Sequence, residues 1–265
     1  LEELAARDWV AESQAALPAE RIGRFHLYGA HNSAALPAGC LALRVEAAMA
    51  FGTGRHGSTA GCLTALTLLA KKRAHRRVLD LGCGTAVLAM AAAKLWPCAV
   101  LAVDNDPGSV LVARENLRAN GLAAQIRVLY GDGLKPTAVR RAAPYDLILA
   151  NILAGPLLAM ARDLARCAAP GGSVILAGLL RRQERSLVAR YRAAGLALVG
   201  TLRFGEWSTL ILRRPSEARQ RAQTRTATLA SRRPGSDRDS GSGVSRPPEP
   251  PSRSGCGWPR AAAGC

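Results

Sequence analysis

A glycine-rich turn and an acid at a set distance beyond it are the residues best suited to chemistry. Residues 79–85 (LDLGCGT) lead from an apolar strand pattern into a helical one, and Asp104 stands 22 residues after Gly82. Gly82 and Gly84 would let a ligand approach the backbone, and N–H groups at a helix N-terminus can face it. An acid that ends the next strand can accept hydrogen bonds from both hydroxyls of a ribose. Together they predict a nucleoside site. A dinucleotide site would have glycine at position 87, which is Val87.

Other polar residues stand at the ends of predicted strands and helices. Asp132 follows the third strand and Asn151 ends the fourth, where each is either a turn residue or a ligand contact. Thr59 begins a predicted helix over 60–70, where its hydroxyl either caps the helix or meets a ligand. Asp106 precedes Pro107, and this pair is typical of a helix cap followed by the first turn.

These residues depend on alternating strand and helix patterns for their positions. Seven strands are expected at Arg77–Leu81, Val100–Asp104, Ile126–Tyr130, Asp146–Asn151, Ser173–Ala177, Leu196–Leu202 and Ser208–Arg213. Further helices are expected at Leu88–Leu95, Pro107–Asn120, Pro156–Cys167 and Arg182–Ala194. Short apolar strands that alternate with helices predict an α/β fold with a parallel sheet covered on both faces. The last two strands have no helix between them, so we expect an antiparallel hairpin.

The chain divides into three parts by composition. Residues 51–214 carry the alternating pattern and are predicted to form the functional domain. Residues 1–50, with a short helix expected over 4–16 and a strand over 41–46, are interpreted as the remnant of an N-terminal region and a linker. Residues 215–265 are rich in Arg, Ser, Pro and Gly and are predicted to be a disordered tail, because they lack a core pattern.

Charge and cysteine content limit the environment and the partners. The chain has 36 Lys and Arg against 19 Asp and Glu, a net charge of +17, which suits RNA or a ribosomal surface but also follows from genome composition alone. None of the seven cysteines forms a C-x-x-C pair, so we expect free thiols, a reducing cytoplasm and no metal. No apolar stretch reaches the length of a membrane helix.

The turn also carries a resemblance to a known fold family. With Asp80 five residues ahead of Thr85, the G-C-G-T core resembles the first motif of class I S-adenosylmethionine-dependent methyltransferases. The resemblance implies a doubly wound, seven-stranded sheet that is mostly parallel and ends in an antiparallel hairpin. It also implies that Asp132 lies near the adenine and that Asp80 either braces the loop or approaches the methionine amino group through water. Ala86 stands where that family usually has a third glycine.

Four runs narrow the resemblance to the PrmA-type methyltransferases: residues 50–59, 79–84, 151–156 and 205–207. Over about residues 8–214, this resemblance implies that methyl groups pass from S-adenosylmethionine to lysine side chains and the terminal amine of a large-subunit ribosomal protein, the eleventh in the standard count. The family's cofactor contacts fall on Thr59, Gly82, Asp104 and Asn151. Its members have an N-terminal recognition domain before the region that begins here at Asp8, and little of it is expected in this sequence.

Asn151 is the predicted catalytic residue. Amine methylation needs a neutral amine whose lone pair points at the sulfonium methyl, and the Asn oxygen with a following backbone carbonyl can accept the amine hydrogens. We expect a monomer that makes weak contact with ribosomal RNA through its basic surface. Two alternatives stay open: a methyltransferase of another protein or of a small-molecule amine, and a non-catalytic protein that binds RNA or the ribosome.

Overall fold

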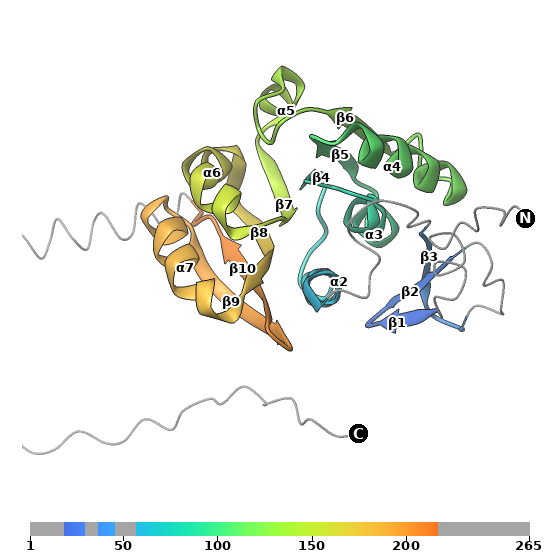
Figure 1. The fold of residues 1–265 in the computed structure, drawn as a ribbon, viewed down its shortest axis with the longest axis horizontal. Coiled ribbons are helices and arrows are strands. Elements are labelled where there is room, and N and C mark those ends of the chain that lie inside the picture. Colours follow the sequence, from blue (N-terminus) through green and yellow to red (C-terminus); the bar gives the residue numbers. More distant parts are fainter. Residues whose placement is uncertain (1–18, 30–36, 46–56, 217–265) are drawn as a thin grey trace, which may run out of the picture. The chain divides into compact units, whose positions relative to one another are not determined.

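A computed structural model describes residues 19–29, 37–45 and 57–216 (Figure 1). The predicted helix over 4–16, the run 50–56 and nearly all of the predicted tail lie outside these ranges. The three-part division of the chain therefore stays a prediction. Within the described ranges, no helix is long and apolar enough to cross a membrane.

The centre of the fold is a seven-stranded sheet with the order β6-β5-β4-β7-β8-β10-β9. Strands β4 to β8 of this sheet run parallel, and β9 and β10 form an antiparallel hairpin in which β10 pairs with β8. The strands are β4 (Arg77–Leu81), β5 (Ala99–Asp104), β6 (Ile126–Tyr130), β7 (Tyr145–Asn151), β8 (Ala168–Leu180), β9 (Ala197–Phe204) and β10 (Trp207–Arg213). This arrangement confirms the predicted fold class.

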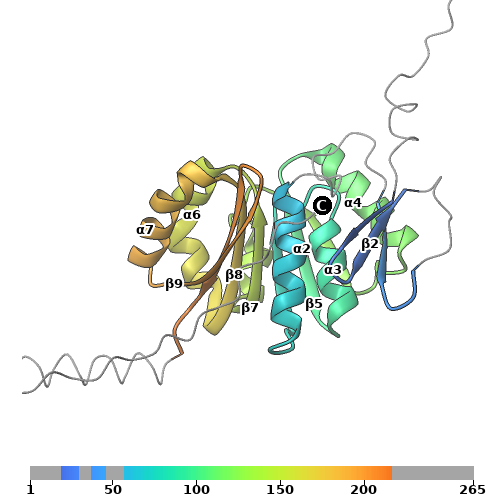
Figure 2. The ribbon, with the colours of Figure 1, turned by 90° about the horizontal axis from the view of Figure 1, so that it is seen from below.

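Helices cover both faces of this sheet, as Figure 2 shows for α2 and α3 on one side and α6 and α7 on the other. The helices are α2 (Gly57–Ala70), α3 (Val87–Leu95), α4 (Pro107–Ala119), α5 (Thr137–Ala142), α6 (Ala154–Cys167) and α7 (Glu184–Ala193). Alternate residues of one strand serve opposite cores: Val100 and Ala102 pack with α2, α3 and α4, whereas Leu101 and Val103 pack with α5, α6 and α7. Continuous apolar strands are what a sheet buried on both faces requires.

A three-stranded sheet precedes α2 and consists of β1 (Glu20–Ile22), β2 (Phe25–Tyr28) and β3 (Leu41–Arg44). Phe25 and Leu43 are fully buried in the core that contains α3. At the edge of β3, the Asn120 side chain accepts a hydrogen bond from the Arg44 N–H at 3.0 Å and donates one to the Arg44 carbonyl at 2.7 Å. A single amide thus satisfies the last backbone groups of β3, as a neighbouring strand would.

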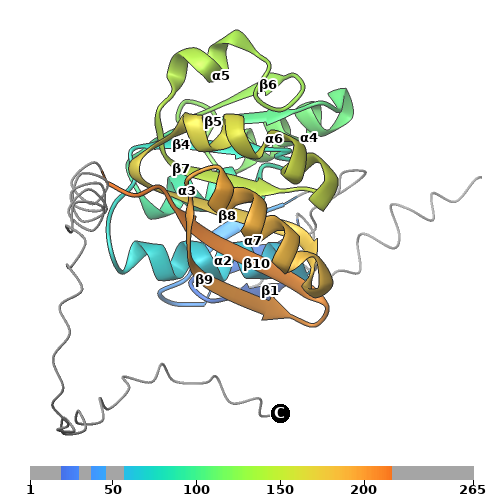
Figure 3. The same cartoon turned by 90° about the vertical axis from the view of Figure 1, so that its left-hand side faces the viewer.

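The sequence patterns missed three short elements, β1, β2 and α5, which have three, four and six residues. Segments this short complete too few periods to be distinguished from loops. The strand predicted over 41–46 is β3. The helix predicted over 60–70 begins earlier, at Gly57, and β8 extends well beyond the predicted 173–177. In Figure 3, α7 lies across the β9–β10 hairpin.

Candidate functional site

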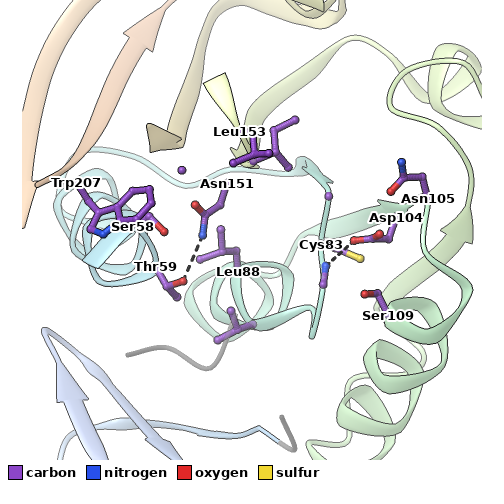
Figure 4. A pocket seen from close by; sticks show the side chains of 15 residues that line it. Ser58, Thr59, Cys83, Leu88, Asp104, Asn105, Ser109, Asn151, Leu153 and Trp207 are labelled. Atoms are coloured by element: carbon purple, nitrogen blue, oxygen red, sulfur yellow. Dashed lines mark hydrogen bonds between the residues drawn. The ribbon is translucent and has the colours of Figure 1, made fainter. Parts of the chain in front are cut away.

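A cavity of about 330 Å³ opens at the carboxyl edge of β4, β5 and β7. Asp104, Asn105 and Ser109 line one end, and Asn151 and Trp207 line the other (Figure 4). The volume falls within the range of small-molecule sites. A site at this edge of an open α/β sheet lies where strand order and connectivity leave a crevice.

The glycine-rich turn after β4 directs its own N–H groups inward. The Gly82 and Cys83 N–H groups donate to the Val103 carbonyl at 2.8 and 3.1 Å, and the Gly84 N–H donates to Asp104 Oδ2 at 2.8 Å. These three N–H groups are thus engaged within the fold, and contact between a ligand and the N–H groups at the N-terminus of α3 stays a prediction. The turn presents backbone surface at close range, and its donors hold β5 and the Asp104 carboxylate in place.

Asp104 ends β5 and is only 8% exposed. Its two oxygens accept from the N–H groups of Gly84, at 2.8 Å, and Asp106, at 3.0 Å. A carboxylate has about four acceptor positions, so about two remain for a ligand. Asp106 in turn caps α4 by accepting from the N–H groups of Gly108 and Ser109, which confirms its predicted role.

Asp80 lies beneath the turn and is 1% exposed. Its Oδ2 accepts from the Ala89 N–H at 2.9 Å, so it braces the first turn of α3, one of its two predicted roles. Its Oδ1 has no hydrogen-bond partner in the described part of the chain. Burial, reinforced by the Asp104 charge and opposed by the Ala89 hydrogen bond, raises the pKa of Asp80 to about 7.

The acids give this helix N-terminus a charge preference opposite to that of a phosphate site. A helix N-terminus ordinarily attracts anions through its free N–H groups. Here Asp80 accepts a hydrogen bond from one of those N–H groups, that of Ala89, and Asp104 lines the adjacent cavity. The Asp104 carboxylate in this cavity disfavours a phosphate and favours a ligand that carries positive charge.

At the other end of the cavity, Asn151 is oriented by Thr59. The Asn151 Nδ2 donates to Thr59 Oγ1 at 3.2 Å, and Thr59 is 1% exposed in the first turn of α2. The amide nitrogen can only donate, so Oδ1 is the side-chain atom of Asn151 that can accept a hydrogen bond. Two residues that are 92 positions apart in sequence thus form one unit.

The two ends of the cavity meet where Ile152 packs on Gly82. A Cβ on Gly82 would lie 2.2 Å from Ile152 Cγ2, so no other residue fits there without a shift of the segment after β7. Gly82 also has a φ of +63°, in the left-handed region that favours glycine. This glycine therefore sets the position of Asn151 relative to the turn.

Five of the six predicted site residues line this cavity: Thr59, Gly82, Gly84, Asp104 and Asn151. Asp132 instead lines a second cavity beside α6, where its Oδ2 pairs with Lys135 Nζ at 2.5 Å. Its contact with adenine stays a prediction. Sequence reasoning did not name as site residues several others that line the first cavity, among them Asn105, Ser109, Leu153 and Trp207. The Gly205-Glu-Trp motif was the available signal for Trp207.

Comparison with known proteins assigns this chain to a family. A family model described as "Ribosomal protein L11 methyltransferase (PrmA)" matches residues 1–215. The chain belongs to this family. Among its curated relatives, the ribosomal protein L11 methyltransferase of Caulobacter sp. strain K31 is 44% identical over 214 residues, which are 81% of this chain and 74% of the relative. The one from Bradyrhizobium diazoefficiens is 47% identical over 209 residues, 79% and 71% of the two chains.

A solved structure of a PrmA-family protein agrees with this assignment. The ribosomal protein L11 methylase from Lactobacillus delbrueckii subsp. bulgaricus superimposes with a TM-score of 0.67 and 26% sequence identity. The match covers 74% of this chain and 98% of that one. As a member of the PrmA family, the chain is a methyltransferase. Within the described ranges, no three His, Cys, Asp or Glu side chains gather as metal ligands would.

Proposed function

We propose that this chain transfers methyl groups from S-adenosylmethionine to lysine side chains and the terminal amine of ribosomal protein L11. The observation that carries the proposal is a single cavity with a ribose-type acid, Asp104, at one end and an oriented amide, Asn151, at the other. Membership of the PrmA family supports the choice of substrate.

The residues at the Asp104 end fit the cofactor. Asp104 has acceptor positions left for two ribose hydroxyls, and the turn at Gly82 and Gly84 gives close access to the backbone. The Asp104 carboxylate favours a positively charged ligand. When bound, S-adenosylmethionine supplies a methyl group on a sulfonium. The neutral thioether is a good leaving group for methyl transfer and needs no metal.

The residues at the Asn151 end suit an amine acceptor. Asn151 Oδ1 accepts an amine hydrogen and so turns the nitrogen lone pair toward the methyl group, while Thr59 holds the amide. Leu153 and Trp207 give this end an apolar wall that limits water. The acceptor reacts as the neutral amine, because only that form has a lone pair, and its population rises as pH approaches the amine pKa.

Two measurements on the full chain test the function. Isothermal titration calorimetry with S-adenosylmethionine should give one site per chain, and Asp104→Ala should weaken it. Radiolabelled S-adenosylmethionine should then label purified L11, with mass spectrometry placing the methyl groups on lysines and the terminal amine. Cofactor binding without transfer to L11, but with transfer to another amine, would replace the substrate. Absence of cofactor binding would overturn the enzymatic function.

Contacts beyond the substrate are the finer part of the proposal. Arg181, Arg182, Arg185 and Arg192 lie exposed on or beside α7. We propose that this basic surface binds ribosomal RNA weakly and that the enzyme acts as a cytoplasmic monomer. Filter binding should show an affinity for RNA that falls steeply when the salt concentration rises from about 50 to about 200 mM. Sedimentation at working concentration tests the monomer.

A further inference from the structure

Glu184 fastens the C-terminal hairpin to the helix that lies across it. Its carboxylate accepts two hydrogen bonds from Arg203, from Nε and from Nη2, both at 2.7 Å. It also accepts a hydrogen bond from the Ser208 hydroxyl, and Ser208 is fully buried. Arg203 and Ser208 face each other across β9 and β10, so one carboxylate holds both strands. Fork-shaped pairing of this kind fixes geometry as well as charge.

The opposite face of the same hairpin forms a wall of the cavity. Trp207 immediately precedes Ser208, and successive side chains of a strand point to opposite faces. Trp207 lines the cavity together with Asn151 and Thr59. The hairpin also packs closely on α2: a Cβ on Gly57 would lie 3.1 Å from Trp207 Cδ1, and one on Gly61 would lie 2.1 Å from Thr209 Oγ1.

Electrostatics supports a fixed attachment. The hydrogen bonds from Arg203, opposed by partial burial and helped by Ser208, hold the pKa of Glu184 below its ordinary value. The carboxylate is therefore charged throughout the neutral range. The Glu184 side chain is 16% exposed, so its pairing with Arg203 is less screened than an ordinary surface ion pair.

We propose that Glu184 is a positioning residue for the methyl acceptor: by fixing β9 and β10 from one face, it sets Trp207 at the amine end of the cavity on the other. The proposal rests on the proposed function. Glu184 lies outside the cavity and touches neither reacting group. Its effect therefore passes through the hairpin to Trp207, and small displacements of a positioning group are costly in group transfer.

The test compares Glu184→Ala, Trp207→Ala and the double variant in methyl transfer to L11. We expect Glu184→Ala to raise the KM for L11 about tenfold, with kcat changed less than threefold and the Kd for S-adenosylmethionine within twofold. Because both residues act on the same wall, the double variant should match Trp207→Ala alone, as expected of coupled residues. Glu184→Gln, which keeps one acceptor oxygen and replaces the other with an NH2 donor, should raise the KM less than Glu184→Ala does.

A matched control removes an acid that also pairs with an arginine, but with one in its own helix instead of in the hairpin. Asp163 in α6 pairs with Arg166 at 3.1 Å, and Asp163→Ala should leave the KM for L11 unchanged. If Glu184→Ala does not fold, Ser208→Ala removes one of the three hydrogen bonds and should raise the KM in the same direction.

The outcomes separate this inference from the function on which it rests. Two outcomes would overturn the role of Glu184 and leave the proposed function intact, provided that the parent chain methylates L11. One is an unchanged KM for L11 in Glu184→Ala. The other is a KM in the double variant that equals the product of the two single effects. A parent chain that binds the cofactor but does not methylate L11 would overturn both. An equal loss of cofactor affinity and L11 affinity would show general damage and would also overturn the inference.

Discussion

Asp80 and Asp146 belong to adjacent strands, β4 and β7, but lie toward opposite edges of the sheet. Asp146 accepts hydrogen bonds from the N–H groups of Arg76, at 2.8 Å, and Arg77, at 3.1 Å, and it interacts with buried His75. Although burial opposes its charge, these partners hold the pKa of Asp146 below its ordinary value. Among the residues that the structure describes, Asp80 has one hydrogen-bond partner and its Oδ1 has none, and its pKa is raised to about 7.

The difference between the two acids separates a structural edge from a functional one. At the amino edge, backbone and side-chain donors converge on a carboxylate and stabilise its charge. At the carboxyl edge, a buried acid is left short of partners beside a cavity, and an alanine adopts a left-handed backbone. Unsatisfied groups and backbone strain reduce stability, and they persist at sites where a ligand uses the geometry.

The largest effect is expected from Asp80→Asn, as a change of stability with pH. The folded chain holds a proton on Asp80 up to about pH 7, whereas the unfolded chain loses it near pH 4, so this group lowers stability as pH rises between the two. The variant lacks this loss. Its free energy of unfolding, relative to the parent, should rise by on the order of 3 kcal/mol from pH 4 to pH 8. Urea unfolding at several pH values measures this, and a gap that does not vary with pH would contradict it.

Asp104→Ala should weaken cofactor binding by about 1.5–3 kcal/mol, the usual range for hydrogen bonds to a charged group. The carboxylate provides the acceptor positions proposed for the ribose. Stability should change less, because Asp104 lies at a strand end and only the Gly84 and Asp106 N–H groups lose a partner. Calorimetric titration with S-adenosylmethionine measures the affinity. A Kd within threefold of the parent would remove Asp104 from the cofactor site.

Asp146→Ala should give the reverse pattern, with stability reduced by about 1–2 kcal/mol and cofactor affinity unchanged. The lowered pKa of Asp146 means that its contribution is present above about pH 4, the unfolded value, and disappears as pH falls through the folded value. Parent and variant should therefore converge in acid, whereas Asp80→Asn and its parent diverge toward alkaline pH. A loss of cofactor affinity equal to that in Asp104→Ala would undo the division between the two edges.

Asn151→Ala should lower kcat for methyl transfer by about tenfold, or about 1.4 kcal/mol, with a smaller change in cofactor Kd. The physical reason is that Thr59 fixes the amide so that Oδ1 orients the amine. Thr59→Val is the companion variant, since it removes only the hydroxyl that holds the amide. Single-turnover kinetics separates the transfer step from binding, and unaltered turnover in Asn151→Ala would assign amine orientation to other groups.

Local patterns were sufficient to predict most of the fold and the strand ends of the site. The seven strands and the hairpin follow from apolar runs, and Asp104 and Asn151 follow from their places at the ends of those runs. These signals are local because strand period and helix period are properties of neighbouring residues. For the same reason, β1, β2 and α5 were too short to be recognised.

What the sequence left out depends on distant contacts. Trp207 reaches the cavity because β10 enters the sheet between β8 and β9, and no local pattern states that order. The N–H groups of the turn point inward because Val103 and Asp104 lie within reach, which is a matter of packing between strands. The raised pKa of Asp80 likewise requires knowledge of burial.

Ala86 offers the smallest and sharpest test of strain at the carboxyl edge. It precedes α3 with a φ of +62°, where the family's usual glycine would be unstrained, and its methyl group is fully buried. Ala86→Gly relieves about 1–2 kcal/mol of left-handed backbone strain, which stabilises the fold. Two effects destabilise it: the loss of a buried methyl group, about 0.8 kcal/mol, and the greater conformational entropy of glycine in the unfolded chain, about 0.5–1 kcal/mol. These terms nearly cancel, so stability should change by less than about 0.5 kcal/mol and the cofactor Kd by less than twofold. Ala91→Gly, in the interior of α3 and fully buried, is the matched control and should lose more than 1 kcal/mol, roughly the helix penalty of glycine plus the buried methyl. Chemical denaturation of both variants measures the free energy of unfolding. A rise above about 1 kcal/mol in Ala86→Gly would mean that the backbone strain at Ala86 is not offset by the other terms. A fall of similar size would mean that packing of the methyl group dominates.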